Sequence, residues 1–432
     1  MQSKTKNKGK VKAKQSYCSA QKAQPVLSCD VQTGEYDAFD NALYIPKVYE
    51  YTHNENLIKP TPIDPNLYET NIEEGKPILT LGYGALNEYS MTMPLMFERP
   101  ALGDNDVLFE VSYCGICHSD WHVILNEWKM TKYPVVPGHE MTGIVIKVGN
   151  KVKKFGVGDL VALSPLYNSC LTCEWCKRGE EQYCLNGYTE TYNFNERLPE
   201  DTKPPTGPLT YGGYSNLMVA HDHFLFKLPK NLPMDRSAPL LCAGMTVYNA
   251  FISCGIQAGD KLGVAGIGGL GHLLIKIAKA KGVEVVALTT TKWKLRDSID
   301  NLGADDAVLM KDKDKLTLMK GKLDYIIDTI PFKHDLDDYL ELLRPKGTLC
   351  VVGALYSLNP DFNTVIRTGK IIRGSNISGT IGTEEFLQFC SQNLILADIE
   401  KVHLGEINNT RNKLTNSEVK YRYVLDIKNS VN

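Results

Sequence analysis

The chain has 432 residues, of which 43% are apolar, and its 48 basic and 50 acidic side chains leave a formal net charge of −2. This length is sufficient for two domains with sizeable cores, and the nearly neutral charge gives no driving force for binding a polyanion, so we expect no nucleic-acid partner. No apolar stretch approaches the roughly 18 residues of a membrane span, and no apolar segment of a secretory signal follows the basic N-terminus, so we expect a cytoplasmic protein without membrane association. In a reducing compartment, clustered cysteines are interpreted first as metal ligands or catalytic thiols.

The first 77 residues form an extension that we expect to be disordered or to lie over the folded body. Residues 1–14 carry six lysines and no acidic residue, whereas residues 15–77 carry ten acidic residues and four lysines. A basic tip with almost nothing apolar to bury usually remains solvated, and weak targeting or surface binding is the alternative.

From residue 78 the sequence is typical of a β-rich domain, in which short apolar runs are separated by Gly, Pro and Asp turns. The clearest runs are 107–111, 143–148 and 160–163. After Cys242, strands alternate with helical stretches, which predicts βαβ units and hence a parallel sheet. The predicted strands are 261–265, 283–289, 305–310, 324–329 and 348–353, with a helix predicted at 270–281.

Two further segments are interpreted from spacing and composition. Leu336, Tyr339, Leu340 and Leu343 have the spacing of one helix face and are expected to belong to the core. Asn193 to Pro208 contains four prolines and almost no apolar residue, which predicts a surface loop.

Four cysteines in a short window follow the pattern C-x2-C-x2-C-x7-C, and they are Cys170, Cys173, Cys176 and Cys184. Two intervening residues allow a tight turn to aim both sulfurs at one ion, and four protein ligands leave no open position. The pattern therefore predicts a structural zinc in a lobe of about residues 165–190, which has few apolar residues of its own. Two disulfides or an iron–sulfur cluster are the alternatives.

Cys117, His139 and Cys242 are weaker candidates, because they are scattered along the chain. A lone cysteine is usually a small buried hydrophobe, and a lone histidine is usually a hydrogen-bonded residue of the core or surface. Taken singly, none of the three predicts a site.

A glycine-rich turn has the pattern G-x-G-x-x-G, formed by Gly266, Gly268 and Gly271 with Gly269 and Leu270 between them. The turn follows an apolar strand and opens a helical stretch, which is the context required of a dinucleotide site with the pyrophosphate at the helix N-terminus.

The end of the next strand indicates which dinucleotide binds. An NAD site places an acidic residue there, about 20 residues after the glycines, and this chain has none. Thr289, Thr290 and Thr291 can instead donate to a 2′-phosphate, while Lys292 and Lys294 can offset its charge, so NADP(H) is favoured. The alternative is a solvated loop that carries lysines.

Together these residues resemble the zinc-dependent medium-chain alcohol dehydrogenases, specifically the cinnamyl alcohol dehydrogenase branch. The matching segments run in family order across residues 78–432, and they are Cys114-Gly-Ile-Cys-His-Ser-Asp120, Pro134-Val-Val-Pro-Gly-His-Glu140, the four-cysteine lobe, Tyr211-Gly-Gly-Tyr-Ser215, Ala238-Pro-Leu-Leu-Cys-Ala-Gly244, Gly266-Ile-Gly-Gly-Leu-Gly-His272 and Val419-Lys-Tyr-Arg-Tyr-Val424. The resemblance implies an α/β chain with a β-rich, GroES-like catalytic domain (78–242), a Rossmann domain with a doubly wound parallel sheet (243–374) and a return to the catalytic domain (375–432).

The resemblance also implies a catalytic zinc bound by Cys117, His139 and Cys242, with Glu140 as an alternative fourth ligand. Asp120 suits a position that orients the ligating histidine, and a helix cap or a solvated carboxylate is its alternative role.

Proton transfer and cofactor choice are implied in the same way. Ser119 is the relay hydroxyl, and His122, three residues further along one helix face, is its outlet to solvent. His118 lies close to the cofactor, and Lys294 matches the basic residue of the NADP-preferring branch better than Lys292 does.

The sequence thus predicts an NADP-dependent, zinc-assisted aldehyde reductase that works reversibly as a primary-alcohol dehydrogenase on aryl, cinnamyl or aliphatic substrates, with two zinc ions per chain. A polyol or other secondary-alcohol dehydrogenase of the same superfamily is one alternative, and a zinc-ribbon binding module with an inert dinucleotide fold is another.

Four further features are interpreted from comparison with the family. The resemblance implies a homodimer formed near residues 371–379. The 77-residue extension has no family counterpart, and the 193–208 loop is longer than its equivalent and is a candidate for shaping the substrate entrance. Trp121 and Trp128 line a substrate pocket or belong to the core.

Overall fold

The computed structural model describes residues 61–63, 72–198, 204–353 and 359–430. Most of the N-terminal extension lies outside the described residues, and so does the prediction that it is disordered or wraps over the folded body. Near its end, β1 (Thr61–Pro62) pairs antiparallel with β3 (Met93–Arg99). Within the described ranges, no helix is both long and apolar enough to cross a lipid bilayer.

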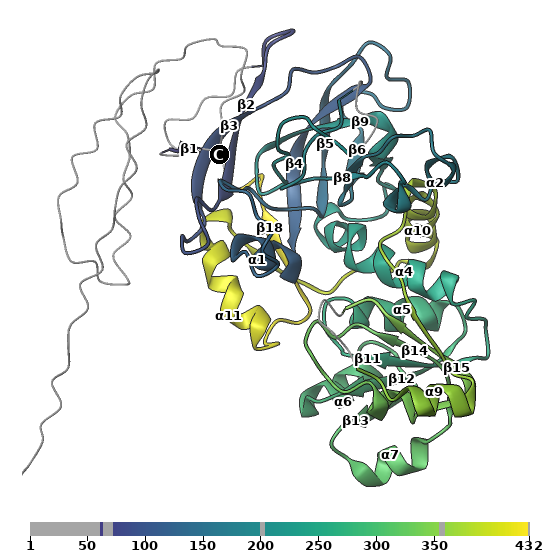
Figure 1. The fold of residues 1–432 in the computed structure, drawn as a ribbon. Helices are drawn as coiled ribbons and strands as arrows, with labels where there is room; N and C mark the ends of the chain where they lie inside the picture. Colours follow the sequence, from purple (N-terminus) through teal and green to yellow (C-terminus); the bar gives the residue numbers. More distant parts are fainter. Residues whose placement is uncertain (1–60, 64–71, 199–203, 354–358, 431–432) are drawn as a thin grey trace, which may run out of the picture. The chain divides into compact units, whose positions relative to one another are not determined.

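A β-rich domain is built on two mainly antiparallel sheets (Figure 1). The smaller sheet has the order β1-β3-β2, with β2 at Ile78–Gly84. The larger has the order β10-β6-β5-β4-β18-β17, with β9 also paired to β4. Its strands are β4 (Asp106–Ile116), β5 (Met141–Val148), β6 (Leu160–Leu163), β9 (Leu217–His221), β10 (Leu225–Lys227), β17 (Ile399–Val402) and β18 (Arg422–Asp426). Because β18 pairs with β4, the end of the chain returns to this domain.

Short elements connect these strands. The four-cysteine lobe contains β7 (Leu166–Asn168), α2 (Glu174–Lys177), η2 (Glu181–Tyr183) and β8 (Thr189–Glu190). The others are α1 (His118–Ile124), η3 (Asp222–Phe224), α3 (Met234–Ser237), η4 (Ala238–Leu241), α4 (Ala243–Ser253), α10 (Thr380–Asn393), η5 (Leu404–Asn409) and α11 (Thr410–Thr415).

The second domain contains a six-stranded parallel sheet of order β13-β12-β11-β14-β15-β16. Its strands are β11 (Lys261–Ala265), β12 (Glu284–Thr289), β13 (Asp306–Leu309), β14 (Leu323–Asp328), β15 (Leu343–Val351) and β16 (Ile371–Gly374). Its helices are α5 (Gly271–Ala280), α6 (Lys292–Asp300), α7 (Lys313–Met319), α8 (Asp337–Leu340) and α9 (Phe362–Thr368). The order along the chain reverses between β11 and β14, and the carboxyl ends of these strands therefore form the crevice in which doubly wound sheets bind dinucleotides.

The predicted strands of the parallel sheet are confirmed within five residues, but one other prediction is wrong. The predicted helix face ends early, because α8 stops at Leu340 and Leu343 already pairs with Leu323 of β14. The prediction that these residues are core is correct, since Leu343 is only 1% exposed. The predicted 193–208 surface loop has no helix or strand among its described residues, and its two arms are joined by an isolated bridge between Asn195 and Leu209.

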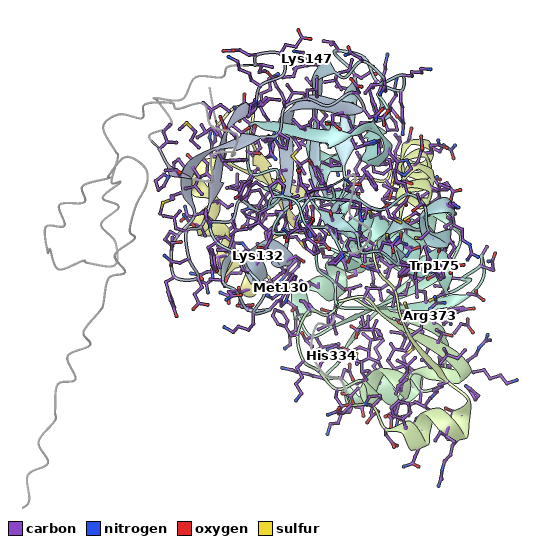
Figure 2. All side chains as sticks on the ribbon, turned by 45° about the horizontal axis from the view of Figure 1, so that its top comes forward. Met130, Lys132, Lys147, Trp175, His334 and Arg373 are labelled. Carbon is purple, nitrogen blue, oxygen red and sulfur yellow. The ribbon has the colours of Figure 1, made fainter. Side chains whose placement is uncertain are left out.

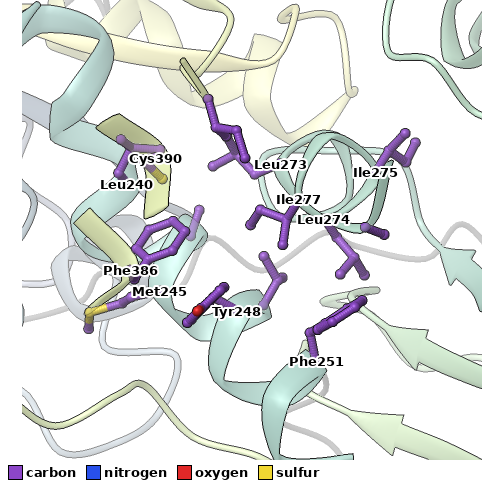
Figure 3. Packing of buried hydrophobic residues seen from close by; sticks show 14 of the residues in the cluster. Leu240, Met245, Tyr248, Phe251, Leu273, Leu274, Ile275, Ile277, Phe386 and Cys390 are labelled. Atoms are coloured by element: carbon purple, nitrogen blue, oxygen red, sulfur yellow. The ribbon is translucent and has the colours of Figure 1, made fainter. Parts of the chain in front are cut away.

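A hydrophobic cluster joins the segment that crosses between the domains to the nucleotide-binding sheet (Figure 3). Leu240 of η4 and Met245 of α4 are fully buried with Leu273 of α5 and Phe386 of α10. Each such side chain contributes roughly 1.5–3 kcal/mol by its removal from water. Because Cys242 lies between η4 and α4, this packing fixes its position.

Candidate active site

Three distant segments bring Cys117, His139, Glu140 and Cys242 together. Cys117 follows β4 and precedes α1, His139 and Glu140 precede β5, and Cys242 precedes α4. Since β4 and β5 are paired along their length, the end of β4 meets the start of β5. One ligand atom from each of the four side chains lies within 4.8 Å of the other three.

The chemistry of this cluster fits a zinc ion. Cys117 is 7% exposed, His139 is 3% exposed and Glu140 is fully buried. Two sulfurs and one imidazole are the protein ligands of a zinc site that leaves a further position open. The hydrogen bond from Cys242, against the opposing effect of burial and together with the contact to His139, holds the pKa of Cys117 well below its usual value, which favours a thiolate ligand.

Asp120 organises the residues around the cluster. This fully buried carboxylate accepts from the backbone N–H groups of Cys117 at 2.9 Å and Gly138 at 3.1 Å, and from the Tyr214 hydroxyl at 2.9 Å. It also accepts from His139 Nδ1 at 3.0 Å, which leaves Nε2 of that ring to bind a metal. Asp120 is therefore both a cap of α1 and the residue that orients the histidine.

Glu140 links the cluster to an arginine that the sequence reasoning missed. Its Oε1 accepts from Arg422, whereas Oε2 and Arg422 Nε have no hydrogen-bond partner among the described residues. Burial raises the pKa of Glu140 to about 7, although Arg422 acts to lower it. Arg422 also contacts the glycine-rich turn, since a Cβ on Gly269 would lie 2.6 Å from its Cδ. The sequence feature that could have identified Arg422 is a single arginine beside the apolar residues of β18.

The candidate relay residues Ser119 and His122 both lie on α1, as predicted from their spacing. The Ser119 hydroxyl lies 3.6 Å from Cys117 Sγ, at the edge of the cluster. His122 Nδ1 is 2.5 Å from Glu127 Oε2, an exposed carboxylate that sequence reasoning missed, although it follows the histidine by five residues. His118 is half-buried, and its Nε2 has no partner in the described part of the chain.

The two tryptophans near the cluster differ in exposure. Trp121 is 8% exposed and packs in the core of the β-rich domain. Trp128 is partly exposed, and its ring centroid lies 5.2 Å from that of His122.

The four cysteines of the lobe also converge, and their sulfurs lie within 4.8 Å of one another. Cys173 Sγ is 3.5 Å from Cys176 Sγ, and the backbone N–H of Cys173 donates to Cys170 Sγ at 3.4 Å. Burial acts to raise the pKa of Cys170, but hydrogen bonds from Thr172 and from the backbone outweigh it and lower this pKa to about 5. Four converging cysteine sulfurs suit a closed tetrahedral zinc site.

Glu181 attaches this lobe to the rest of the molecule. Its fully buried carboxylate accepts from the Thr380 backbone N–H at 2.9 Å and hydroxyl at 2.7 Å, and from His223 at 2.8 Å. The lobe is therefore fixed to the start of α10.

The glycine-rich turn connects β11 to α5 as predicted. Gly266 has φ +82°, and a Cβ on Gly271 would lie 2.0 Å from the Gly266 carbonyl oxygen. A Cβ on Gly268 would meet nothing within 4 Å, so open space lies beside the turn. With Gly269 and Leu270 between them, these residues leave backbone accessible at the N-terminus of α5, which is where a pyrophosphate binds.

The end of β12 has the composition predicted for a 2′-phosphate site. Thr289 ends the strand, Thr290 is exposed, and Thr291 precedes α6. Lys294 lies on the first turn of α6 with its Nζ 5.4 Å from the Trp293 ring, and burial lowers its pKa, whereas Lys292 is exposed. Thr289 and Lys294 are therefore the more enclosed of the candidate residues.

A β-rich domain with a Cys2His cluster and a four-cysteine lobe, followed by a doubly wound sheet, defines the class of zinc-dependent dehydrogenases. Residues 103–230 match the family described as alcohol dehydrogenase GroES-like domain, and residues 269–392 match the zinc-binding dehydrogenase family. The chain belongs to the zinc-dependent medium-chain alcohol dehydrogenases, in the cinnamyl alcohol dehydrogenase branch, and is an oxidoreductase that acts on CH–OH groups.

Its relatives support this assignment. A probable zinc-type alcohol dehydrogenase-like protein of Acanthamoeba polyphaga mimivirus is 43% identical over 90% of this chain and 94% of its own length. A probable mannitol dehydrogenase of Medicago sativa is 44% identical over 82% of this chain and 96% of its own length.

Two solved structures show the same fold. A cinnamyl alcohol dehydrogenase of Sorghum bicolor is 36% identical, with a TM-score of 0.77 over 82% of this chain and 98% of the sorghum chain. The cinnamyl alcohol dehydrogenase (CAD) of Helicobacter pylori complexed with NADP(H) is 35% identical, with a TM-score of 0.76 over 82% of this chain and all of the bacterial chain.

Proposed function

We propose that this enzyme interconverts aldehydes and primary alcohols by hydride transfer with NADP(H), using a zinc ion bound by Cys117, His139 and Cys242. The convergence of these three side chains carries the proposal, and Arg422 links their neighbour Glu140 to the glycine-rich turn. Glu140 is an alternative ligand, because one of its carboxylate oxygens belongs to the same cluster. When bound, the zinc supplies a Lewis acid for the substrate oxygen, and the nicotinamide supplies or accepts the hydride.

The chain's own residues then hold and move a proton. In the reductive direction the Ser119 hydroxyl donates a proton to the oxygen of the product, and His122 restores it. His122 hydrogen-bonds to Glu127, whose carboxylate is 46% exposed, so the route ends in solvent. Asp120 keeps the imidazole of His139 in one orientation throughout.

In this scheme Arg422 connects the cluster of Cys117, His139 and Cys242 with the glycine-rich turn. It holds Glu140 through Oε1 and lies against Gly269, so one guanidinium faces both sites. Its unpartnered Nε, a buried charged donor, is suited to an anionic oxygen of the cofactor.

For the cofactor, Gly266, Gly268, Gly269, Leu270 and Gly271 are proposed to cradle the pyrophosphate. The 2′-phosphate is proposed to bind Thr289, Thr290, Thr291 and Lys294. The NADP(H) complex of the Helicobacter pylori relative supports this choice of cofactor.

A second zinc ion is proposed at Cys170, Cys173, Cys176 and Cys184, where it closes the lobe and leaves no position for substrate. The chain would thus bind two zinc ions. We further propose the domain limits 78–242, 243–374 and 375–432, with residues 1–77 as an extension.

A cytoplasmic homodimer is the proposed state of the enzyme. No described strand pairs with the outer side of the edge strand β16, and three apolar side chains near it are exposed by 51% to 75%: Ile371, Phe362 and Ile366. An exposed strand edge beside apolar residues favours pairing with a second copy.

A polyol dehydrogenase is the second candidate function, and the name of the Medicago sativa relative, probable mannitol dehydrogenase, favours it. The two candidates differ in the substrate that is oxidised with NADP⁺.

The test follows NADPH absorbance with cinnamyl, benzyl and straight-chain aldehydes, with NADH and with mannitol plus NADP⁺ in parallel. We expect NADPH oxidation by aldehydes and its loss in Cys242→Ser, while the matched control Cys254→Ser, outside both metal clusters, keeps the activity. Oxidation of mannitol without reduction of any aldehyde would favour the second candidate. Full activity in Cys242→Ser would contradict the proposed zinc site.

A further inference from the structure

The hairpin at residues 193–210 is built into the β-rich domain. Its two described arms, 193–198 and 204–210, are joined by backbone hydrogen bonds, among them those between Glu196 and Pro208 and between Thr210 and Phe194. On one side, Glu196 accepts from the Tyr167 hydroxyl at 3.3 Å. The hairpin is therefore anchored to the body of the domain and can fix the position of a neighbouring segment.

Its other side holds the turn formed by residues 126–132. Asn193 Oδ1 accepts from the backbone N–H of Lys132 at 2.8 Å, and Asn193 Nδ2 donates to the carbonyl of Met130 at 3.4 Å. Lys132 Nζ donates to Asn195 Oδ1 at 2.7 Å. Met130 and Lys132 lie next to one another in Figure 2. Since Asn193 is only 6% exposed, water cannot readily replace its two bonds to the turn.

The turn needs such support. Asn126 and Lys129 have φ values of +51° and +58°, a conformation that costs energy for residues other than glycine. Within the turn, Asn126 Oδ1 accepts from the Thr131 backbone N–H at 3.1 Å. This bond fixes the first half of the turn, while Asn193 fixes the segment from Met130 to Lys132.

The turn ends a row of four aromatic rings that starts in the nucleotide-binding domain. Ring centroids are 6.1 Å apart for Phe332 and His118, 6.3 Å for His118 and His122, and 5.2 Å for His122 and Trp128. The row passes beside Cys117, which directly precedes His118. Trp128 belongs to the clamped turn, so the hairpin sets the position of the last ring.

We propose that Asn193 is a positioning residue through which the hairpin sets the enzyme's preference among aldehydes, by holding Trp128 at the end of the aromatic row. This inference rests on the proposed function. A fixed ring favours substrates whose aryl group reaches the end of the row, and it matters little to a three-carbon aldehyde that stays near the cluster.

The experiment compares Asn193→Gly, which tolerates φ +62° but loses both bonds, with Asn193→Asp, which keeps the acceptor for Lys132. The matched control is Asn408→Ala, which loses a similar pair of bonds to the backbone of Thr92, at 3.1 and 3.0 Å. Each variant is assayed with NADPH against cinnamaldehyde and propionaldehyde, and hydrogen exchange of residues 126–132 is measured.

We expect Asn193→Gly to increase exchange in the turn and to lower kcat/KM for cinnamaldehyde about five- to tenfold, mainly through KM, with less than about a twofold change for propionaldehyde. In Asn193→Asp, the exchange of the turn and the kcat/KM for cinnamaldehyde should lie between those of the wild type and those of Asn193→Gly. Asn408→Ala should leave the ratio of kcat/KM for the two aldehydes unchanged. If the wild type is active and Asn193→Gly leaves either the ratio or the exchange unchanged, the inference is wrong although the proposed function stands. A wild type that oxidises NADPH with neither aldehyde refutes the proposed function and this inference with it.

Discussion

Replacing Asp120 by asparagine changes the residue that orients the proposed catalytic ligand without changing its size. The carboxylate accepts four hydrogen bonds and is fully buried, so no water can compensate for a lost acceptor. The substitution therefore isolates the effect of one oxygen atom and one charge.

The expected loss of unfolding free energy follows from how the four hydrogen-bond donors are divided between the two carboxylate oxygens. Oδ1 accepts from Gly138 and His139, and Oδ2 accepts from Cys117 and Tyr214. The NH2 group of an asparagine must face one of these pairs. The hydroxyl can rotate and the imidazole can change tautomer, but the backbone N–H of Gly138 or Cys117 cannot adapt. One unsatisfied buried donor costs about 1–3 kcal/mol of unfolding free energy.

The same change loosens the orientation of His139. Altering such an outer partner of a zinc ligand typically weakens metal binding by about 10–100-fold. We therefore expect Asp120→Asn to lose zinc from the Cys117 cluster at lower chelator concentration than the wild type.

The assay measures zinc retained after dialysis against graded chelator, together with urea unfolding. The four-cysteine lobe is an internal reference, because Asp120 contacts none of its ligands. Tyr214→Phe is the control, since it removes one donor and keeps the carboxylate, and its zinc affinity should change less than about threefold. An Asp120→Asn enzyme with wild-type unfolding free energy and wild-type zinc retention would show that Asp120 does not orient His139.

Three further predictions concern other parts of the chain. Lys294→Ala should raise KM for NADPH about tenfold while changing KM for NADH less than twofold, because only NADPH carries the 2′-phosphate; equal effects on both cofactors would contradict the role of Lys294. Cys170→Ser should reduce zinc content from about two to about one per chain and lower the Tm, since a closed site loses a ligand; unchanged zinc content by metal analysis would exclude the structural site. His272 is buried, which lowers its pKa to about 3, so the folded state binds its proton less readily than the unfolded state, whose pKa is about 6.5. The stability that neutral His272 contributes is complete above the unfolded pKa and is lost as the pH falls, by about 2 kcal/mol of unfolding free energy at pH 5. In His272→Asn, the unfolding free energy measured with urea should therefore change less between pH 7 and pH 5 than it does in the wild type.

Much of the site was predictable because the ligands are encoded locally. The four cysteines lie within a single lobe, and the glycine-rich turn is read together with the strand and helix that flank it. Cys117, His139 and Cys242 needed the family resemblance, because nothing in their separation along the chain indicates that β4, β5 and α4 meet at one point.

One residue that was missed, Arg422, acts across a long separation along the chain. Arg422 reaches Glu140 only because β18 pairs with β4, a pairing of distant segments that no local pattern specifies. The helix face that included Leu343 was extended too far because apolar residues at helical spacing continue into a buried strand. The pairing of the two arms of the 193–210 segment was not predicted, because its prolines and polar side chains give no strand pattern, although backbone hydrogen bonds join the arms.

Anomalous diffraction at the zinc absorption edge decides whether Cys117, His139 and Cys242 share one zinc ion. We expect one peak at about 2.0–2.4 Å from Cys117 Sγ, His139 Nε2 and Cys242 Sγ, and a second peak among the four cysteines of the lobe. Crystals of active enzyme with no anomalous peak at the first position would contradict this expectation.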